Sequence, residues 1–169
     1  MRKLAFLPML LLVFGAAGCE DDPPTQPTPG VPTFAMSLLS SNEVPAIQGA
    51  EASCAGTVTI RFNITRDAAQ AITAATADFQ ATVTGCPSST VITAAHIHPG
   101  AAGTTGGVIV NTTLATGEVG GNGSFTKNGI SMTPQIAQQI LDNPAGHYFN
   151  IHSQANSTGV IRAQLVRTN

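Results

Sequence analysis

The sequence of 169 residues contains little charge, and positive charge is the scarcer sign. Only 9% of the residues are charged, with seven Lys and Arg against nine Asp and Glu. A basic stripe for nucleic acid or anionic lipid is therefore absent, and nucleic acid is not expected as a partner. The apolar run near the N-terminus covers only residues 4–14, which is too short for a permanent membrane-spanning helix.

Several motifs that would point to catalysis are also missing. The chain shows no Ser-His-Asp order, no paired catalytic carboxylates, no glycine-rich phosphate loop and no nucleotide fingerprint. Hydrolytic and nucleotide chemistry therefore have no support. Because no repeat period is evident, we expect one domain of ordinary size over residues 33–169.

The N-terminus is typical of a bacterial lipoprotein signal. Arg2 and Lys3 precede the apolar run, and the small residues Gly15-Ala16-Ala17-Gly18 precede Cys19. This order predicts a signal peptide over residues 1–18 and lipidation of Cys19. A simple signal peptide with another cleavage point is the alternative. Both interpretations of the N-terminus predict a protein located outside the cytoplasm. The lipidated form predicts anchoring to a bacterial membrane of the cell envelope, facing the periplasm or the exterior.

Residues 19–32 form an acidic, proline-rich stretch with almost no apolar side chains. Such a segment cannot bury enough surface to offset its ordering entropy, so we expect an extended tether between the lipid and the domain. Arg2 and Lys3 would leave with the signal peptide. Five basic and nine acidic residues would then remain, a net charge of about −4.

Cys54 and Cys86 are an even pair in an oxidising compartment once Cys19 is assigned to the anchor. No Cys-x-x-Cys spacing is present, and each of the two lies near an expected strand end, so we predict a structural disulfide. Closing a loop of about 33 residues would stabilise the fold by about 3–4 kcal/mol in the chain-entropy model. A redox or metal-binding pair is the alternative.

The rest of the domain favours β structure, because Thr, Val, Ile, Ala and Gly dominate and apolar residues often recur at period two. Turn-forming pairs such as Pro99-Gly100 and Asn122-Gly123 separate the apolar stretches. The expected strands cover residues 33–39, 56–64, 74–83, 91–98, 108–114, 121–126, 147–153 and 159–167. About eight short strands predict an all-β Greek-key sandwich or barrel.

One segment has the periodicity of a helix instead. Thr133 stands at the N-cap position and Pro134 at the first helical position. Apolar residues follow at helical spacing, namely Ile136, Ala137, Ile140 and Leu141. Pro144 ends the pattern. We expect one short helix that covers an end of the β structure.

Three of the four histidines fall where strand geometry favours a metal site. His96 and His98 are two residues apart on an expected strand, so their side chains share one face. His152 lies near the end of another expected strand, and its imidazole would complete a half-open copper or zinc site. Imidazole suits both metals, and intrinsic affinity favours copper. The alternative for His96 and His98 is a polar pair on a solvated strand face.

The last two strands allow a more detailed prediction. If residues 153–158 join them as a hairpin, Asn150 lies opposite Arg162, with His152 diagonal to Arg162 on the same polar outer face. Arg162 would then be placed to steer an anion. The more common role for such an arginine is pairing with a carboxylate or a carbonyl across the strands.

Two further residues are weaker ligand candidates. Glu43 would bind the metal or orient a histidine, and the alternative is a structural role that bonds loop amides. His147 would be a fourth ligand. Its alternative is a partly buried histidine bonded to backbone, on the apolar side or at the start of its strand.

Four separated segments carry a resemblance to a known family. They are Ser41-Asn42-Glu43-Val44-Pro45, Ala95-His96-Ile97-His98, the segment from Tyr148 to Ser153, and the segment from Gly159 to Leu165. In this order they resemble CHRD domains, first described in chordin and common in bacterial secreted proteins. Ala163 departs from the usual Gly, and His147 lies outside the shared pattern. The resemblance implies an immunoglobulin-like β-sandwich or barrel, and it says less about function.

The His-x-His strand is also similar, in constellation rather than sequence, to copper/zinc superoxide dismutases. Those β-barrels carry copper on an outer face near an arginine that attracts the anion. Our leading hypothesis is a lipid-anchored domain that binds copper through His96, His98 and His152. One alternative is a superoxide-dismutase-like copper oxidoreductase in which Arg162 attracts superoxide. The other is a non-enzymatic adhesion or scaffold module whose protein partner is unknown.

Overall fold

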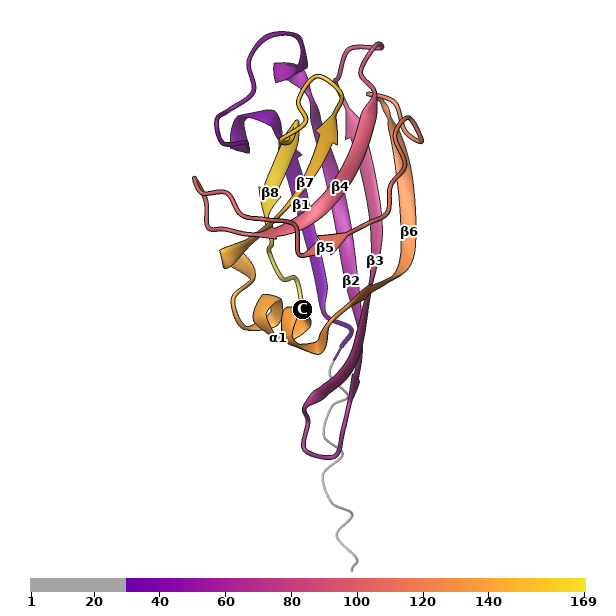
Figure 1. The fold of residues 1–169 in the computed structure, drawn as a ribbon, viewed down its shortest axis with the longest axis vertical. Coiled ribbons are helices and arrows are strands. Elements are labelled where there is room, and N and C mark those ends of the chain that lie inside the picture. The colour runs from indigo at the N-terminus through magenta and orange to yellow at the C-terminus, as the bar shows by residue number, and fades with distance from the viewer. Residues whose placement is uncertain (1–29) are drawn as a thin grey trace, which may run out of the picture.

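The computed structural model describes residues 30–169, so the expected signal peptide, Cys19 and residues 19–29 of the expected tether lie outside the described residues. Eight antiparallel strands form one sheet in the order β5-β4-β7-β8-β1-β2-β3-β6, which curls into a nearly closed barrel (Figure 1). The strands are β1 Thr33–Leu39, β2 Ala55–Arg66, β3 Ile72–Thr84, β4 Ile92–Pro99, β5 Val110–Asn111, β6 Gly123–Met132, β7 His147–Ser153 and β8 Ile161–Gln164. The predicted all-β barrel with one short helix is confirmed.

The barrel interior is filled by alternate residues of each strand. In β2, Val58, Ile60 and Phe62 are buried while their neighbours in the chain are less so, as period-two alternation requires. Aromatic rings bridge strands that are distant in the sequence: the Phe79 and Phe149 centroids lie 5.8 Å apart. Burial of this apolar set stabilises the fold by about 25 cal/mol per Å² of surface removed from water.

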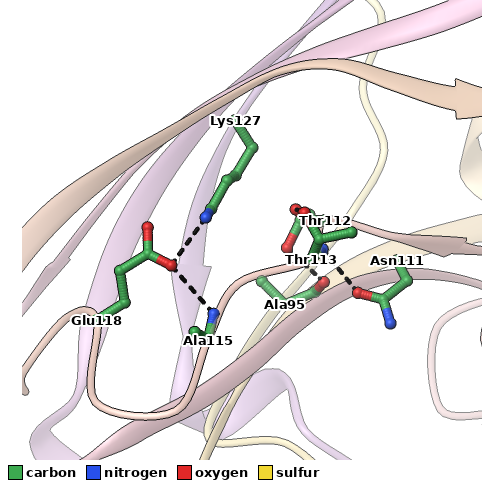
Figure 2. Close-up of polar contacts among 7 residues, drawn as sticks. All are labelled: Ala95, Asn111, Thr112, Thr113, Ala115, Glu118 and Lys127. Atoms are coloured by element: carbon green, nitrogen blue, oxygen red, sulfur yellow. Dashed lines mark hydrogen bonds and ion pairs between the residues drawn. The ribbon is translucent and has the colours of Figure 1, made fainter.

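The two edges of the sheet, β5 and β6, are linked by the segment between them. The Lys127 ammonium on β6 lies 2.8 Å from Glu118 Oε2, which also accepts a hydrogen bond from the Ala115 amide at 3.0 Å (Figure 2). On the other edge, the buried Thr112 hydroxyl donates to the Ala95 carbonyl of β4 at 2.8 Å. These contacts fix the segment between β5 and β6, which passes from one edge of the sheet to the other.

The helix α1, Pro134–Asp142, lies at one end of the barrel (Figure 1). The Thr133 side chain accepts a hydrogen bond from the Ile136 amide at 3.2 Å, which confirms the predicted N-cap. Ala137 and Ile140 form its buried face. Three short 3-10 turns complete the structure, η1 Ser40–Asn42, η2 Gly49–Ser53 and η3 Pro144–Gly146. Within residues 30–169, no helix has both the length and the apolar character needed to cross a membrane.

The cysteines and two strand boundaries test the sequence predictions further. Cys54 and Cys86 are bonded, which confirms the predicted disulfide. The strand expected over residues 108–114 is wrong in length, since β5 has only two residues and Thr113 turns the chain away with a φ of 60°. The strand expected to end at residue 126 continues to Met132. It does so through a bulge at Gly129, whose φ is 66° and whose amide donates to Asp78.

Candidate metal centre

The candidate site is built on three adjacent strands, β4, β7 and β8. Their register sets His96 opposite Asn150 and Asn150 opposite Arg162. The hairpin register predicted for Asn150 and Arg162 is therefore confirmed. Because these residues alternate with buried apolar ones along each strand, they project from the outer face of the barrel.

The imidazoles of His96, His98 and His152 converge on this outer face. Their ligand nitrogens all lie within 4.8 Å of one another, so the group can hold a metal ion. In a bound site each nitrogen would lie about 2.0–2.1 Å from the ion, and the nitrogens would be roughly 3–4 Å apart. The structure thus brings together the three histidines that strand alternation had singled out.

Backbone carbonyls fix which nitrogens are free to bind. His98 Nδ1 lies 3.0 Å from the Gly106 carbonyl oxygen, and His152 Nδ1 lies 2.9 Å from that of Ser157. A carbonyl oxygen only accepts, so each Nδ1 carries the proton and each Nε2 carries a lone pair. The same arrangement orients histidine ligands in known metal sites.

One of these lone pairs has no partner. His98 Nε2 is buried and makes no hydrogen bond, whereas His152 Nε2 lies 3.0 Å from His96 Nδ1. An unpartnered buried acceptor is unfavourable by about 1–3 kcal/mol. A metal ion bound by His98 Nε2, His152 Nε2 and a nitrogen of His96 would remove that penalty.

Burial keeps all three imidazoles neutral. Desolvation lowers the pKa of His96 to about 4, and the neighbouring His152 and His98 lower it further in the same direction. Desolvation is also the main reason that the pKa values of His98 and His152 are lowered, against the opposing effect of their carbonyl partners. At neutral pH the site therefore presents lone pairs rather than positive charges, as a metal requires.

Loop residues cover the outer face, so its side chains are largely shielded from solvent. This differs from the alternative of a polar histidine pair on a solvated strand face. The Arg162 Nη2 donates to the Ala101 carbonyl at 3.2 Å, and Gln164 Nε2 donates to the Gly100 carbonyl at 2.9 Å. A Cβ on Gly106 would collide with the Pro99 carbonyl oxygen, so this loop depends on glycine to lie so close. His98 and His152 are buried beneath the cover, and His96 alone of the three stays partly exposed.

The two weaker ligand candidates lie outside the histidine group. Glu43 Oε1 is 3.5 Å from Asn150 Nδ2, and burial raises the pKa of Glu43 to about 7 against the opposing charge of Arg162. His147 Nδ1 lies 2.9 Å from the Asn143 carbonyl, at the start of β7. Its position matches the interpretation of a buried histidine bonded to backbone.

The role of Tyr148 beside the site was not recognised from the sequence, whereas Asn150 was expected opposite Arg162. The Tyr148 ring stacks on the His98 imidazole, and Asn150 Oδ1 is buried without a hydrogen-bond partner, as is Arg162 Nη1. Alternation already set Tyr148 and Asn150 on the face of His152. The contact of Tyr148 with His98 depends on the pairing of β7 with β4, which no local pattern reveals. Arg162 as an anion-steering residue stays a prediction, and its side chain is only 1% exposed.

Comparison with known proteins agrees with this architecture. The model of the CHRD domain family matches residues 34–165, which covers most of the chain and all of the candidate ligands. No curated protein and no solved structure matches the chain. The match spans the barrel from β1 to the end of β8, and on that ground the chain belongs to the CHRD domain family.

Proposed function

We propose that this protein is a metal-binding domain of the bacterial cell envelope that holds copper through His96, His98 and His152. One observation carries the proposal: three neutral imidazoles converge, and His98 Nε2 is left buried without a partner. Two of the rings are already fixed by carbonyls in the tautomer that a metal needs.

Copper is favoured over zinc by the composition of the site. The ligand group contains imidazole alone, and the intrinsic affinity of such sites is highest for Cu(II). Cys54 and Cys86 are joined in a disulfide and offer no thiolate, which removes the ligand that would most favour zinc in a structural site. Zinc remains the alternative ion.

The location outside the cytoplasm is supported by the disulfide, which persists in oxidising compartments, and by the CHRD domain itself. Anchoring through a lipid on Cys19 is part of the proposal, with residues 19–32 as the tether and the membrane as the partner. Cell fractionation tests this part: a Cys19→Ala variant should move from the membrane fraction to the soluble fraction. A variant that stays membrane-bound contradicts lipid anchoring.

Metal titration of the purified protein tests the site. We expect about one equivalent of Cu(II) with imidazole nitrogen couplings in the EPR spectrum, and loss of that signal in a His96→Gln, His98→Gln double variant. His147→Gln is the matched control, because His147 bonds to the Asn143 carbonyl and should leave binding unchanged. Unaltered Cu(II) affinity in the double variant would contradict the proposal and favour the adhesion or scaffold module.

A superoxide-dismutase-like copper oxidoreductase is the second candidate, favoured by the partial exposure of His96. A three-histidine site keeps a coordination position for a small ligand, and the exposed side of His96 offers a route to it. The copper-loaded protein should then remove superoxide faster than an equal amount of free Cu(II). Equal rates would leave metal binding intact and exclude the enzyme.

A further inference from the structure

The Tyr148 ring contacts both the candidate metal site and the buried, positively charged side chain of Arg162. β7 lies between β4 and β8, so Tyr148 meets His98 on one neighbouring strand and Arg162 on the other. The His98 and Tyr148 centroids are 4.8 Å apart with planes 6° apart, and Arg162 Cζ lies 3.4 Å from the Tyr148 centroid. These contacts place the guanidinium within roughly 8 Å of the His98 ring, well inside the range of electrostatic interaction.

The charge of Arg162 is incompletely compensated. The side chain is 1% exposed, and in the part of the chain that the structure describes the sole ion pair joins Lys127 and Glu118. Nη2 of Arg162 donates to two neutral oxygens, those of Ala101 and the Gln164 side chain, while Nη1 has no partner. A guanidinium stays protonated in proteins, so a positive charge remains beside the site with little water to screen it.

We infer that Arg162 determines which ions the site prefers, because its buried charge biases the three histidines toward monovalent over divalent metal. For copper the bias favours Cu(I) over Cu(II). The inference rests on the proposed function, since it concerns the ion held by the same histidines. It assigns Arg162 a role that does not require contact with substrate or solvent.

Coulomb's law gives the expected size of the effect of Arg162 on metal affinity. At an effective dielectric constant of about 20, two unit charges roughly 10 Å apart repel enough to lower an affinity about tenfold. A divalent ion is repelled twice as strongly as a monovalent one. Removing the charge should therefore strengthen Cu(II) binding more than Cu(I) binding and shift the ratio of the two affinities roughly tenfold.

Competition titrations at pH 8 measure this ratio, with a chromophoric Cu(I) chelator under anaerobic conditions and a Cu(II) chelator of known affinity. Arg162→Gln should shift the ratio about tenfold toward Cu(II), while Arg162→Lys, which keeps the charge, should stay near wild type. Arg61→Gln is the matched control, because Arg61 is exposed on β2 and its loss changes the net charge equally.

A second variant tests whether a buried charge near the histidines sets the ratio of the two affinities. At pH 8 the wild-type Glu43 carboxyl is ionised, since burial raises its pKa only to about 7, and it partly offsets the Arg162 charge. Glu43→Gln should therefore shift the ratio toward Cu(I), opposite in direction to Arg162→Gln. If Arg162→Gln alone does not fold, the double variant Arg162→Gln, Glu43→Gln removes both buried charges and should shift the ratio about tenfold toward Cu(II) relative to Glu43→Gln.

The outcomes separate the inference from the proposed function. If the wild-type protein binds neither copper ion through its histidines, both are overturned. If it binds both ions and the ratio is the same in wild type and in each folded variant, metal binding stands and the inference is overturned. A shift of similar size in Arg61→Gln would also overturn it, because net charge rather than the buried position of Arg162 would then be the cause.

Discussion

The two faces of the β4–β7–β8 ladder are both buried, yet they differ in chemistry. On the inner face Ile97, Phe149 and Ile161 pack into an apolar core. On the outer face Asn150 and Arg162 are as fully buried, but loop backbone and polar side chains cover them. Burial on the inner face is favourable by itself, whereas burial on the outer face removes polar groups from water.

The inner face therefore stabilises the fold, whereas buried polar groups on the outer face destabilise it. Each residue of the inner face gains by contact with its neighbours, and none has a polar side chain to satisfy. The outer face carries three buried polar atoms without partners, on His98, Asn150 and Arg162. Such groups persist mainly where a protein uses them, which is why the two faces should respond differently to mutation and to metal.

The largest effect should come from the inner face. Phe149→Ala removes a fully buried ring that stacks with Phe79 at 5.8 Å, and we expect a loss of about 3–5 kcal/mol in the free energy of unfolding. Urea unfolding monitored by circular dichroism measures it, with and without metal. A loss below about 1 kcal/mol would mean that the interior closes around the cavity, and the contrast between the faces would weaken.

On the outer face, Glu43 should make stability depend on pH. Its pKa is about 7 in the folded protein against 4.5 unfolded, so the folded state holds the proton more tightly. The contribution of Glu43 to stability is therefore highest below pH 4.5 and is lost as pH rises through 7, by roughly 3 kcal/mol in total. Glu43→Gln should abolish this fall. Unfolding free energies of both proteins from pH 4.5 to 8 provide the test, and parallel curves would contradict it.

Metal should act on the outer face alone. At a free concentration one hundred times its dissociation constant, a bound ion adds about 2.7 kcal/mol to the free energy of unfolding. His98→Gln should lose this increment, whereas Phe149→Ala should keep it, because the two side chains project from opposite faces and their effects should add. Thermal melts with and without Cu(II) measure the increment. Its loss in Phe149→Ala would show that the faces are coupled.

The inner face was largely predictable from the sequence, because period-two alternation and turn residues are local signals. Seven-residue strands at residues 33–39 and 147–153 were predicted with their observed bounds. The strand expected over residues 159–167 is shorter, Ile161–Gln164. Two other boundaries failed where one residue departs from ordinary strand geometry. Thr113 and Gly129 both have positive φ, and the sequence does not say whether such a residue ends a strand or forms a bulge within it.

The outer face was predictable only in part. Alternation placed His96 with His98 and Asn150 with His152, and the hairpin gave the register of Arg162. The burial of these side chains was not predictable, because it comes from loop residues such as Ala101 and Gly106 that fold back across the strands. Contacts of this kind join segments that are far apart in the sequence, and they produce no periodic pattern within it.

The smallest effect should come from one hydroxyl of the outer face. Tyr148 Oη accepts a hydrogen bond from the Gly106 amide at 3.4 Å, and the carbonyl of the same glycine faces His98 Nδ1. The bond is long, so Tyr148→Phe should lower the free energy of unfolding by less than about 1 kcal/mol while keeping the ring stack. Amide hydrogen exchange at Gly106 should be faster in the variant, with the Gly129 amide of β6, which donates to Asp78, as an internal reference. A stability loss as large as that of Phe149→Ala would mean that the loop cover stabilises the barrel as strongly as its core does, and the contrast between the two faces would no longer hold.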